Sequence, residues 1–128
     1  MKTKLITKDS KYYTEINNYI EKPVEPMYTI ILLDNDKLIG FYQIVEHDND
    51  QTHYTPWIAN VYIKEEYRHQ GYGKILIKSI PDYLKKLNIS PIYLHTRHKN
   101  LYEKFNWQLL SPLYLSDGIK RNIYILKK

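Results

Sequence analysis

The stretch "NVYIKEEYRHQGYGKILI" (residues 60–77) carries the strongest structural signal in the sequence. It holds two of the chain's four glycines, Gly71 and Gly73, between a run rich in β-branched and aromatic residues (57–63) and a run with helical periodicity. Glycine offers no side-chain contacts, and its backbone is more costly to order than that of any other residue. The pattern therefore predicts a strand, a loop that needs bare backbone, and then a helix.

A strand–loop–helix junction of this kind can bind an anion. The first four amides of a helix have no acceptor within the helix, and the helix dipole adds about half a positive charge at the same end. Without a Cβ at positions 71 and 73, phosphate oxygens could approach these amides closely. The spacing alone fits equally well with a turn glycine and a helix-start glycine that hold no ligand.

Two common phosphate loops do not fit this stretch. The nucleotide P-loop requires serine or threonine after its lysine, whereas Ile75 follows Lys74. The dinucleotide fingerprint requires a third glycine where Leu76 stands. It also requires an acidic residue about twenty positions further on, where the chain has Pro91 and Ile92. Neither nucleotide motif is therefore predicted.

Length and composition indicate one globular domain over residues 1–128. Because the chain has no cysteine, disulfides, thiolate metal sites and cysteine nucleophiles are excluded. The formal net charge of +5 suits an anionic partner, but it also fits an ordinary solvated surface. No apolar run approaches the roughly 20 residues that cross a bilayer, and "MKTKLITKDS" lacks a signal-peptide core. We therefore expect a cytoplasmic protein without a membrane partner.

Periodicity and turn residues predict the other elements. Apolar residues at i, i+4 and i+8 indicate a helix over 9–22, which "KPVEP" ends. The helix that follows the glycines runs to Leu87 and contains Pro81, which we expect to kink or split it. Hairpin strands followed by alternating helices and strands indicate an α/β (α+β) domain with a mixed sheet. The remaining predicted elements are a hairpin of strands 27–34 and 37–47, a loop 48–56, strands 57–63 and 91–96, a short helix 98–106, and a closing strand pair, 107–115 and 121–128.

Two motifs together resemble those of the Gcn5-related N-acetyltransferase (GNAT) superfamily. The first begins with glutamine or arginine, has glycine three positions later, and ends with glycine or alanine; here it reads Arg68-His69-Gln70-Gly71-Tyr72-Gly73. The second is close to L-Y-E-K-x-G followed by F or W, and "LYEKFNW" (101–107) matches it. Both stand in the family's order, and the resemblance covers residues 57–107 closely. Asn106 replaces the usual glycine, and we expect it to end the short helix in a left-handed conformation.

The resemblance implies a fold, a cofactor and a set of cofactor-binding residues. The fold would be a single GNAT-like domain with a mixed central sheet of about six to seven strands, flanked by helices, and the cofactor acetyl-coenzyme A (acetyl-CoA). By resemblance, the amides of 70–74 hold the pyrophosphate, and the backbone of Val61–Ile63 pairs with pantetheine. Arg68 would close the loop or reach a phosphate. Lys74 and Lys104 are candidates for the 3′-phosphate, with a solvated surface lysine as the alternative. The implied cofactor-binding residues are Val61, Tyr62, Ile63, Arg68, His69, Gln70, Gly71, Tyr72, Gly73, Lys74, Tyr102 and Lys104.

The same resemblance suggests the catalytic residues. Tyr102 corresponds to a tyrosine that lies near the coenzyme A sulfur and protonates the departing thiolate; the alternative is a tyrosine that only packs. The attacking amine must lose a proton, and Glu46, at the end of a strand, is the first candidate for this base. The other candidates are His47, Asp48 and His53. For Glu46 the alternative is an exposed loop carboxylate.

The implied reaction is direct attack of a primary amine, on a small molecule or a peptide, on the thioester. No cysteine is present to carry an acetyl group, so transfer would take place in a ternary complex. The part of the chain before the first hairpin is short, and in the family that part shapes the acceptor pocket. The acceptor therefore stays open, as does a homodimer formed through the final strand.

Three other interpretations remain open at the level of sequence. A GNAT-like domain could bind coenzyme A as a sensor or an interaction domain without catalysis. A basic nucleic-acid-binding module would stack bases on Tyr62, Tyr93 and Tyr124 if these shared one exposed face, but no RNA-binding signature accompanies them and no nucleic acid is expected. The pair His95-x-x-His98 suggests a metal site, but it lacks a third ligand at a suitable spacing, so no metal is expected.

Overall fold

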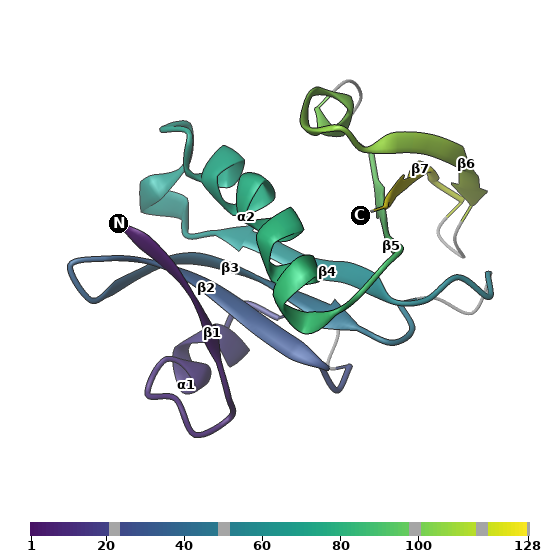
Figure 1. The fold of residues 1–128 in the computed structure, drawn as a ribbon. Helices are drawn as coiled ribbons and strands as arrows, with labels where there is room; N and C mark the ends of the chain where they lie inside the picture. The colour runs from purple at the N-terminus through teal and green to yellow at the C-terminus, as the bar shows by residue number, and fades with distance from the viewer. Residues whose placement is uncertain (21–23, 49–51, 98–100, 115–117, 128) are drawn as a thin grey trace.

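The computed structural model describes the chain apart from residues 21–23, 49–51, 98–100, 115–117 and 128. Seven strands form one sheet in the order β1-β2-β3-β4-β5-β7-β6 (Figure 1). Neighbouring strands are antiparallel except β4 and β5, which are parallel, so the predicted mixed sheet is confirmed. The strands are β1 (Lys2–Ile6), β2 (Tyr28–Asp34), β3 (Lys37–Val45), β4 (Trp57–Ile63), β5 (Ile92–Thr96), β6 (Gln108–Tyr114) and β7 (Lys120–Leu126).

Strand β1 is the element that the sequence patterns did not predict. It pairs antiparallel with β2, from Lys2 opposite Leu33 to Ile6 opposite Thr29. Of its five residues only Ile6 is buried, so the alternation that identifies a half-buried strand is absent. Its pairing with β2, and not its own composition, makes it a strand. Exposed lysines on such an edge strand oppose pairing with a further sheet.

Helix α1 (Tyr13–Asn17) is shorter than the predicted helix over 9–22, whose length is therefore wrong. Ahead of it, the Oγ of Ser10 accepts a hydrogen bond of 3.2 Å from the amide of Tyr12, which holds a turn in place of the first helical residues. A helix of five residues is not stable by itself and depends on packing. Ile16, which is completely buried, provides that contact with the sheet.

Helix α2 (Tyr72–Leu87) has the predicted range and is not split at Pro81. Its buried residues recur at spacings of three and four, and this apolar stripe packs the helix onto the sheet on both sides of the proline. Two short 3₁₀-helices complete the chain, η1 (Glu65–Tyr67) and η2 (Tyr102–Phe105). Within the described part of the predicted helix 98–106, only η2 is helical.

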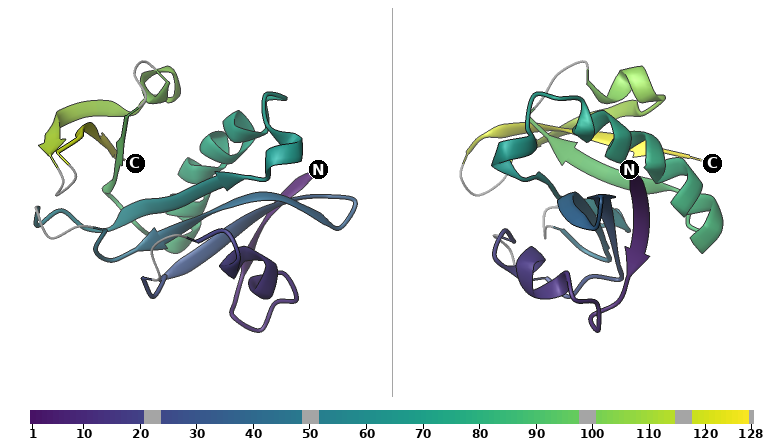
Figure 2. Two further views of the ribbon diagram at one scale, coloured as in Figure 1. Left: turned by 180° about the vertical axis from the view of Figure 1, so that it is seen from behind. Right: turned by 90° about the vertical axis from the view of Figure 1, so that its left-hand side faces the viewer.

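The two α-helices lie on opposite faces of the sheet (Figure 2). The larger hydrophobic cluster, which includes Ile30, Ile80 and Leu94, lies under α2. Smaller clusters lie on the α1 face, one around Phe41 and Ile16 and another around Trp57. Both faces of the central strands are therefore covered by apolar side chains.

A bulge in β4 interrupts its pairing with β3. Phe41 lies opposite Tyr62 and Gln43 lies opposite Ala59, so β4 holds one extra residue between these pairs. Asn60 in the bulge has a left-handed φ of +53°. Its Nδ2 donates to Oε1 of the fully buried Gln43 over 2.9 Å, and Gln43 in turn donates to Oγ1 of Thr29. The buried amide chain fixes the shape of β4 at this point.

Strands β4 and β5 stay together only at one end. Their single registered pair is Trp57 with Tyr93, next to a hydrogen bond of 3.0 Å from the Tyr93 amide to the Pro56 carbonyl. Beyond this pair the strands separate, as the view of β4 and β5 in Figure 1 shows. The separation exposes the edge of β4 immediately after the bulge and opens the sheet beneath the start of α2.

Candidate functional site

The opening between β4 and β5 forms a groove of about 470 Å³, called here the β4–β5 groove. Side chains and backbone from both strands, the first turn of α2 and the start of η2 line it. The lining residues are Asp48, Ile58, Ala59, Asn60, Val61, Gly73, Ile77, Leu94, His95, Thr96, Leu101 and Tyr102. Apolar walls with a few convergent polar groups are typical of a small-molecule site.

The glycine loop closes one end of this groove. Gly71 precedes the first residue of α2 with a φ of +86°, a conformation that favours glycine. Gly73 lies in the first turn of α2. A Cβ on either glycine would meet no described atom within 4 Å. The space above both residues is open, as an approaching anion requires.

The N-terminus of α2 carries neither of the usual stabilising side chains. No side chain of the described residues caps its amides, and no acidic residue lies in its first turn. The first amides of the helix are therefore free to bond an external acceptor, with the dipole favouring a negative charge. Anion binding at Gly71–Lys74 stays a prediction, which this uncapped helix start permits.

Arg68 is engaged within the loop. Its Nε donates to the carbonyl oxygen of Ile63 over 2.8 Å, and its guanidinium lies 5.1 Å from the centre of the Tyr62 ring. Tyr62 also stacks on Tyr19 beyond the end of α1, with 4.7 Å between ring centres. Of the two roles open for Arg68, closing the loop is the one that this geometry supports.

The other cofactor-binding residues implied by the sequence lie around the groove in two groups. Val61 lines the groove on the edge of β4, whereas Tyr62 and Ile63 pack their side chains into the clusters on either face of the sheet. Their backbone, and not their side chains, is what β4 can offer to a ligand. Exposed or half-buried side chains surround the glycines and η2: His69, Gln70, Tyr72, Lys74 and Lys104.

Tyr102 is buried beside the groove. It is 7% exposed, and its ring contacts those of Trp107 and Tyr124, each with 5.9 Å between ring centres. Burial raises the pKa of the Tyr102 phenol above its ordinary value of 10, so the hydroxyl keeps its proton at neutral pH. Asn106 ends η2 with a φ of +69°, which confirms its predicted left-handed conformation.

Glu46, the first candidate for the base, does not line the groove. Its side chain is 73% exposed, and its carboxylate lies 3.7 Å from Nε2 of the neighbouring His47. Two residues further along, Asp48 turns inward, is 12% exposed, and contacts the imidazole of His95 in β5 with its carboxylate. Among the carboxylates and histidines considered from the sequence, Asp48 and His95 are the ones that the structure brings beside Tyr102.

His95 entered the sequence analysis only as one half of a metal pair with His98. His98 lies outside the described residues, and among the residues that are described no three histidine, cysteine or acidic side chains lie together as a metal site would require. A stronger signal for His95 was its position in a strand after the parallel crossover. Ligand sites commonly lie at that end of such strands.

The three tyrosines considered as base-stacking residues do not form one surface in the structure. Tyr124 is 1% exposed in the cluster under α2. Tyr62 lies on the opposite face beneath Tyr19, and Tyr93 stacks on Tyr54. The three tyrosines proposed to stack bases therefore share no exposed face. Separately, none of the helices in the described ranges is long and apolar enough to cross a membrane.

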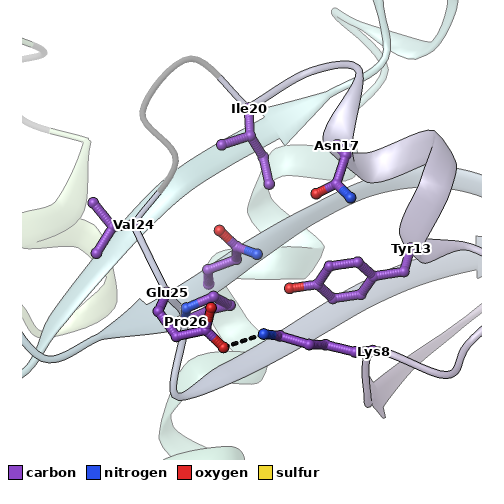
Figure 3. Close-up of a pocket in the computed structure, with 8 residues that line it drawn as sticks. Lys8, Tyr13, Asn17, Ile20, Val24, Glu25 and Pro26 are labelled. Carbon is purple, nitrogen blue, oxygen red and sulfur yellow. Dashed lines mark ion pairs between the residues drawn. The ribbon is translucent and has the colours of Figure 1, made fainter.

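A second hollow, of about 510 Å³, lies on the α1 face of the sheet (Figure 3). Its sides come from α1 and from the segment before β2, and Lys8 and Glu25 form an ion pair across it. Gln43 lines this hollow and bonds Asn60, which lines the β4–β5 groove. One hydrogen bond between neighbouring strands therefore links a lining residue of the hollow to a lining residue of the groove. The hollow is lined by Lys8, Tyr13, Asn17, Ile20, Val24, Glu25, Pro26 and Gln43.

Comparison with known proteins identifies the family. The family model described as the acetyltransferase (GNAT) family matches residues 2–107. A protein of Bacillus subtilis (strain 168), the uncharacterized protein YyaT, is 28% identical over 68 residues. That match spans 52% of this chain and 46% of the other, so the chain aligns with about half of that relative's length.

Two solved structures show the similarity of fold. A Bacillus subtilis acetyltransferase in complex with coenzyme A has a TM-score of 0.69 and 17% identity, with 98% of this chain and 97% of the other covered. A proposed streptothricin acetyltransferase of Bacillus anthracis in complex with acetyl-CoA has a TM-score of 0.60 and 24% identity, with 88% and 68% covered. Because the family model covers most of the chain, the chain belongs to the GNAT family of acetyltransferases.

Proposed function

We propose that this chain is an acetyl-CoA-dependent N-acetyltransferase that acts on a primary amine. The observation that carries the proposal is the convergence of three features on one groove. These are the uncapped N-terminus of α2 behind Gly71, the free edge of β4 at Val61, and the protonated hydroxyl of Tyr102. Each of them is suited to a different part of an acyl-coenzyme A.

The residues present fit this cofactor. Open space above Gly71 and Gly73 leaves the amides of 70–74 accessible to the pyrophosphate. The edge of β4 beyond Trp57 has backbone groups that pantetheine amides can pair with, as an added strand would. Lys74 and Lys104, whose side chains are exposed, are the candidates for contact with the 3′-phosphate. Family relatives from Bacillus anthracis and Bacillus subtilis hold acetyl-CoA and coenzyme A respectively, which supports the assignment.

Acetyl-CoA, when bound, supplies a thioester whose acetyl group an amine can take. The chain's own residues would then bind, orient and move protons. Backbone N–H groups near Val61 would polarise the thioester carbonyl, because donors fixed in a dry groove stabilise developing negative charge. The hydroxyl of Tyr102 would give its proton to the departing sulfur. Since no cysteine is available to carry the acetyl group, transfer to the amine is direct.

The hollow on the α1 face is the proposed acceptor side. It combines the carboxylate of Glu25 with the hydroxyl of Tyr13 and the amides of Asn17 and Gln43. Because Lys8 already pairs with the Glu25 carboxylate, the hollow offers an acceptor hydrogen-bonding groups and both signs of charge, and its lining does not select the acceptor by charge. The hydrogen bond between Gln43 and Asn60 places the floor of this hollow directly behind the wall of the groove.

Thiol release in the presence of a panel of amines tests the proposal. The panel contains streptothricin, a polyamine, an aromatic monoamine and a lysine-containing peptide, and mass spectrometry identifies the acetylated product. We expect at least one acceptor to be acetylated, and Tyr102→Phe to lower kcat by about 10²-fold or more while it keeps the affinity for acetyl-CoA.

Tyr83→Phe is the matched control, because Tyr83 has the same 7% exposure as Tyr102 but lies in α2 away from the groove lining. It should leave kcat unchanged. If the wild type binds acetyl-CoA but acetylates no amine, the protein is a coenzyme A sensor and not an enzyme. If a well-folded wild type does not bind acetyl-CoA at all, the proposed function is wrong.

A further inference from the structure

The wall of the β4–β5 groove contains a half-buried acid–histidine pair that the proposed reaction does not yet use. Asp48 follows β3 and His95 belongs to β5, so the fold joins residues that are 47 positions apart in sequence. Oδ2 of Asp48 contacts Nε2 of His95, and the two side chains are only 12% and 14% exposed. Both residues line the groove together with Tyr102.

His95 is held firmly but lacks ordinary hydrogen bonds. Its ring packs edge-on to Trp57, with 5.7 Å between ring centres and 67° between ring planes. Both ring nitrogens are shielded from solvent, and within the described part of the chain neither makes a hydrogen bond of ordinary geometry. Buried polar atoms almost always have a partner. These nitrogens lie at the wall of the groove, where a small rotation of the ring would let one of them bond a ligand atom.

The contact with Asp48 determines which nitrogen is available. A carboxylate at Nε2 favours the tautomer with its proton on that nitrogen, because this N–H can then donate to the carboxylate. Nδ1 then has a free lone pair. A neutral imidazole accepts a proton at such a lone pair, which is how histidine acts as a general base.

We propose that Nδ1 of His95 accepts the proton that the acceptor amine must lose, with Asp48 as the residue that positions the ring. This inference rests on the proposed function. An alkylammonium acceptor gives up two protons when its nitrogen forms the new C–N bond and the C–S bond of the thioester breaks. One of them passes through His95 to the solvent, and the sulfur takes up one proton from Tyr102, whose phenol is reprotonated by the other. Atoms and charge balance without any further reactant.

The other titratable groups near the groove are less suited to this step. Glu46 is on the exposed side of the β3 end, and His53 is exposed in the loop before β4. Tyr102 holds its proton and is the donor. Asp48, which follows β3, is the charged group that contacts His95, and Tyr102 from η2 lines the same groove. Of the strands on either side, β4 contributes Trp57 against the ring and β7 places Ile123 opposite His95.

Nuclear magnetic resonance of ¹⁵N-histidine-labelled protein tests the geometry without any turnover. His95→Gln identifies the signals of His95, and coenzyme A alone, which cannot acetylate, is the added ligand. We expect the nitrogen shifts of His95 to show a proton on Nε2 and none on Nδ1, and to change when coenzyme A saturates the groove. In Asp48→Asn the preference for this tautomer should be lost. A proton on Nδ1, or His95 signals that do not respond to coenzyme A, would overturn the proposal.

Kinetics with whichever amine of the panel is acetylated provide the second readout. His95→Gln should lower kcat/KM by about 10²–10⁴-fold at neutral pH, the usual contribution of a general base. Its rate should recover as pH rises, because more of the amine is then already neutral, and KM for acetyl-CoA should stay unchanged. Glu46→Gln is the rival variant: a loss of rate there, with none in His95→Gln, assigns the base to Glu46 and rejects His95. If the wild type acetylates no amine although His95 responds to coenzyme A, the proposed function itself has failed, and the role of His95 in it fails too.

Discussion

Gly40→Ala tests how closely β3 must approach β4 opposite the edge that we assign to pantetheine. Gly40 is in register with Ile63, and a Cβ there would lie 2.4 Å from the carbonyl oxygen of Tyr62 and 2.7 Å from Cδ1 of Ile63. Ordinary contacts begin at 3.4 Å, so the difference of 1.0 Å is the distance by which the β4 backbone must move. Overpacking of this kind costs about 1–3 kcal/mol.

Urea unfolding and calorimetric titration of acetyl-CoA measure the two consequences. We expect the free energy of unfolding to fall by about 1–3 kcal/mol. We also expect a roughly tenfold weaker affinity for acetyl-CoA, equivalent to about 1.4 kcal/mol, because the displaced residues belong to the proposed binding edge. Gly73→Ala is the control for stability, since its Cβ would meet no described atom within 4 Å. It should unfold at the same or a higher urea concentration. A Gly40→Ala protein with wild-type stability and affinity would refute this reasoning.

Three further substitutions have defined outcomes. Asn60→Ala should destabilise the protein by about 1–3 kcal/mol, because it strains a left-handed backbone and removes a partner of buried Gln43. Urea unfolding should show a smaller loss of stability for Asn60→Gly, since glycine adopts the left-handed conformation without strain. Equal losses in the two variants would contradict the contribution from backbone strain. Pro81→Ala should raise the free energy of unfolding, measured in urea, by up to about 3 kcal/mol, since proline inside a helix lacks a backbone donor. A lower free energy of unfolding in this variant would show that Pro81 stabilises the folded helix. The bond from Lys64 to Glu15, 2.8 Å long, raises the pKa of Lys64. Its stabilisation is therefore complete below the unfolded-state pKa of 10.5 and is lost as pH rises through the higher folded-state value. Thermal unfolding of Glu15→Gln should differ from the wild type at pH 7–9 and converge with it only once pH has risen past the folded-state pKa of Lys64, above 10.5. A difference that persists beyond that pH would exclude this bond as its source.

Local patterns in the sequence were sufficient for the central part of the fold. The hairpin of β2 and β3, the strand β4 and the range of α2 were all predicted, because alternation, turn residues and a helical apolar stripe are properties of contiguous residues. The GNAT membership inferred from two short motifs is confirmed by the match of the family model. These motifs and elements lie in the part of the chain where backbone geometry is dictated locally.

Elements that depend on distant partners were missed or wrong. Strand β1 exists because β2 offers it an edge, and its own residues show no alternation of buried positions. Helix α1 ends early although its apolar spacing continues to Ile20, because only Ile16 is fully buried. Periodicity indicates which residues can face a core, but it does not show how far a core extends.

The candidate site shows the same limit at the level of single side chains. The glycine loop and Tyr102 could be placed from their motifs. The choice between Glu46 and Asp48 depended on how the chain turns after β3, and the structure points Asp48 inward and leaves Glu46 exposed. The contact between His95 and Asp48 depends on the fold, which brings β5 close to the residues that follow β3. No pattern of neighbouring residues contains that information.

Calorimetric titration of acetyl-CoA into the wild type, Gly71→Glu and Gly118→Glu tests the central claim most directly. Both glycines have positive φ, +86° and +75°, with no described atom within 4 Å of a Cβ, so each glutamate brings the same strain and charge. We predict a Kd on the order of micromolar for the wild type and for Gly118→Glu. Gly71→Glu should bind at least tenfold more weakly, since like charges about 4 Å apart repel by about 1–4 kcal/mol near a protein surface. Equal affinities in the two variants, or a folded wild type that does not bind acetyl-CoA, would contradict the assignment of the β4–β5 groove.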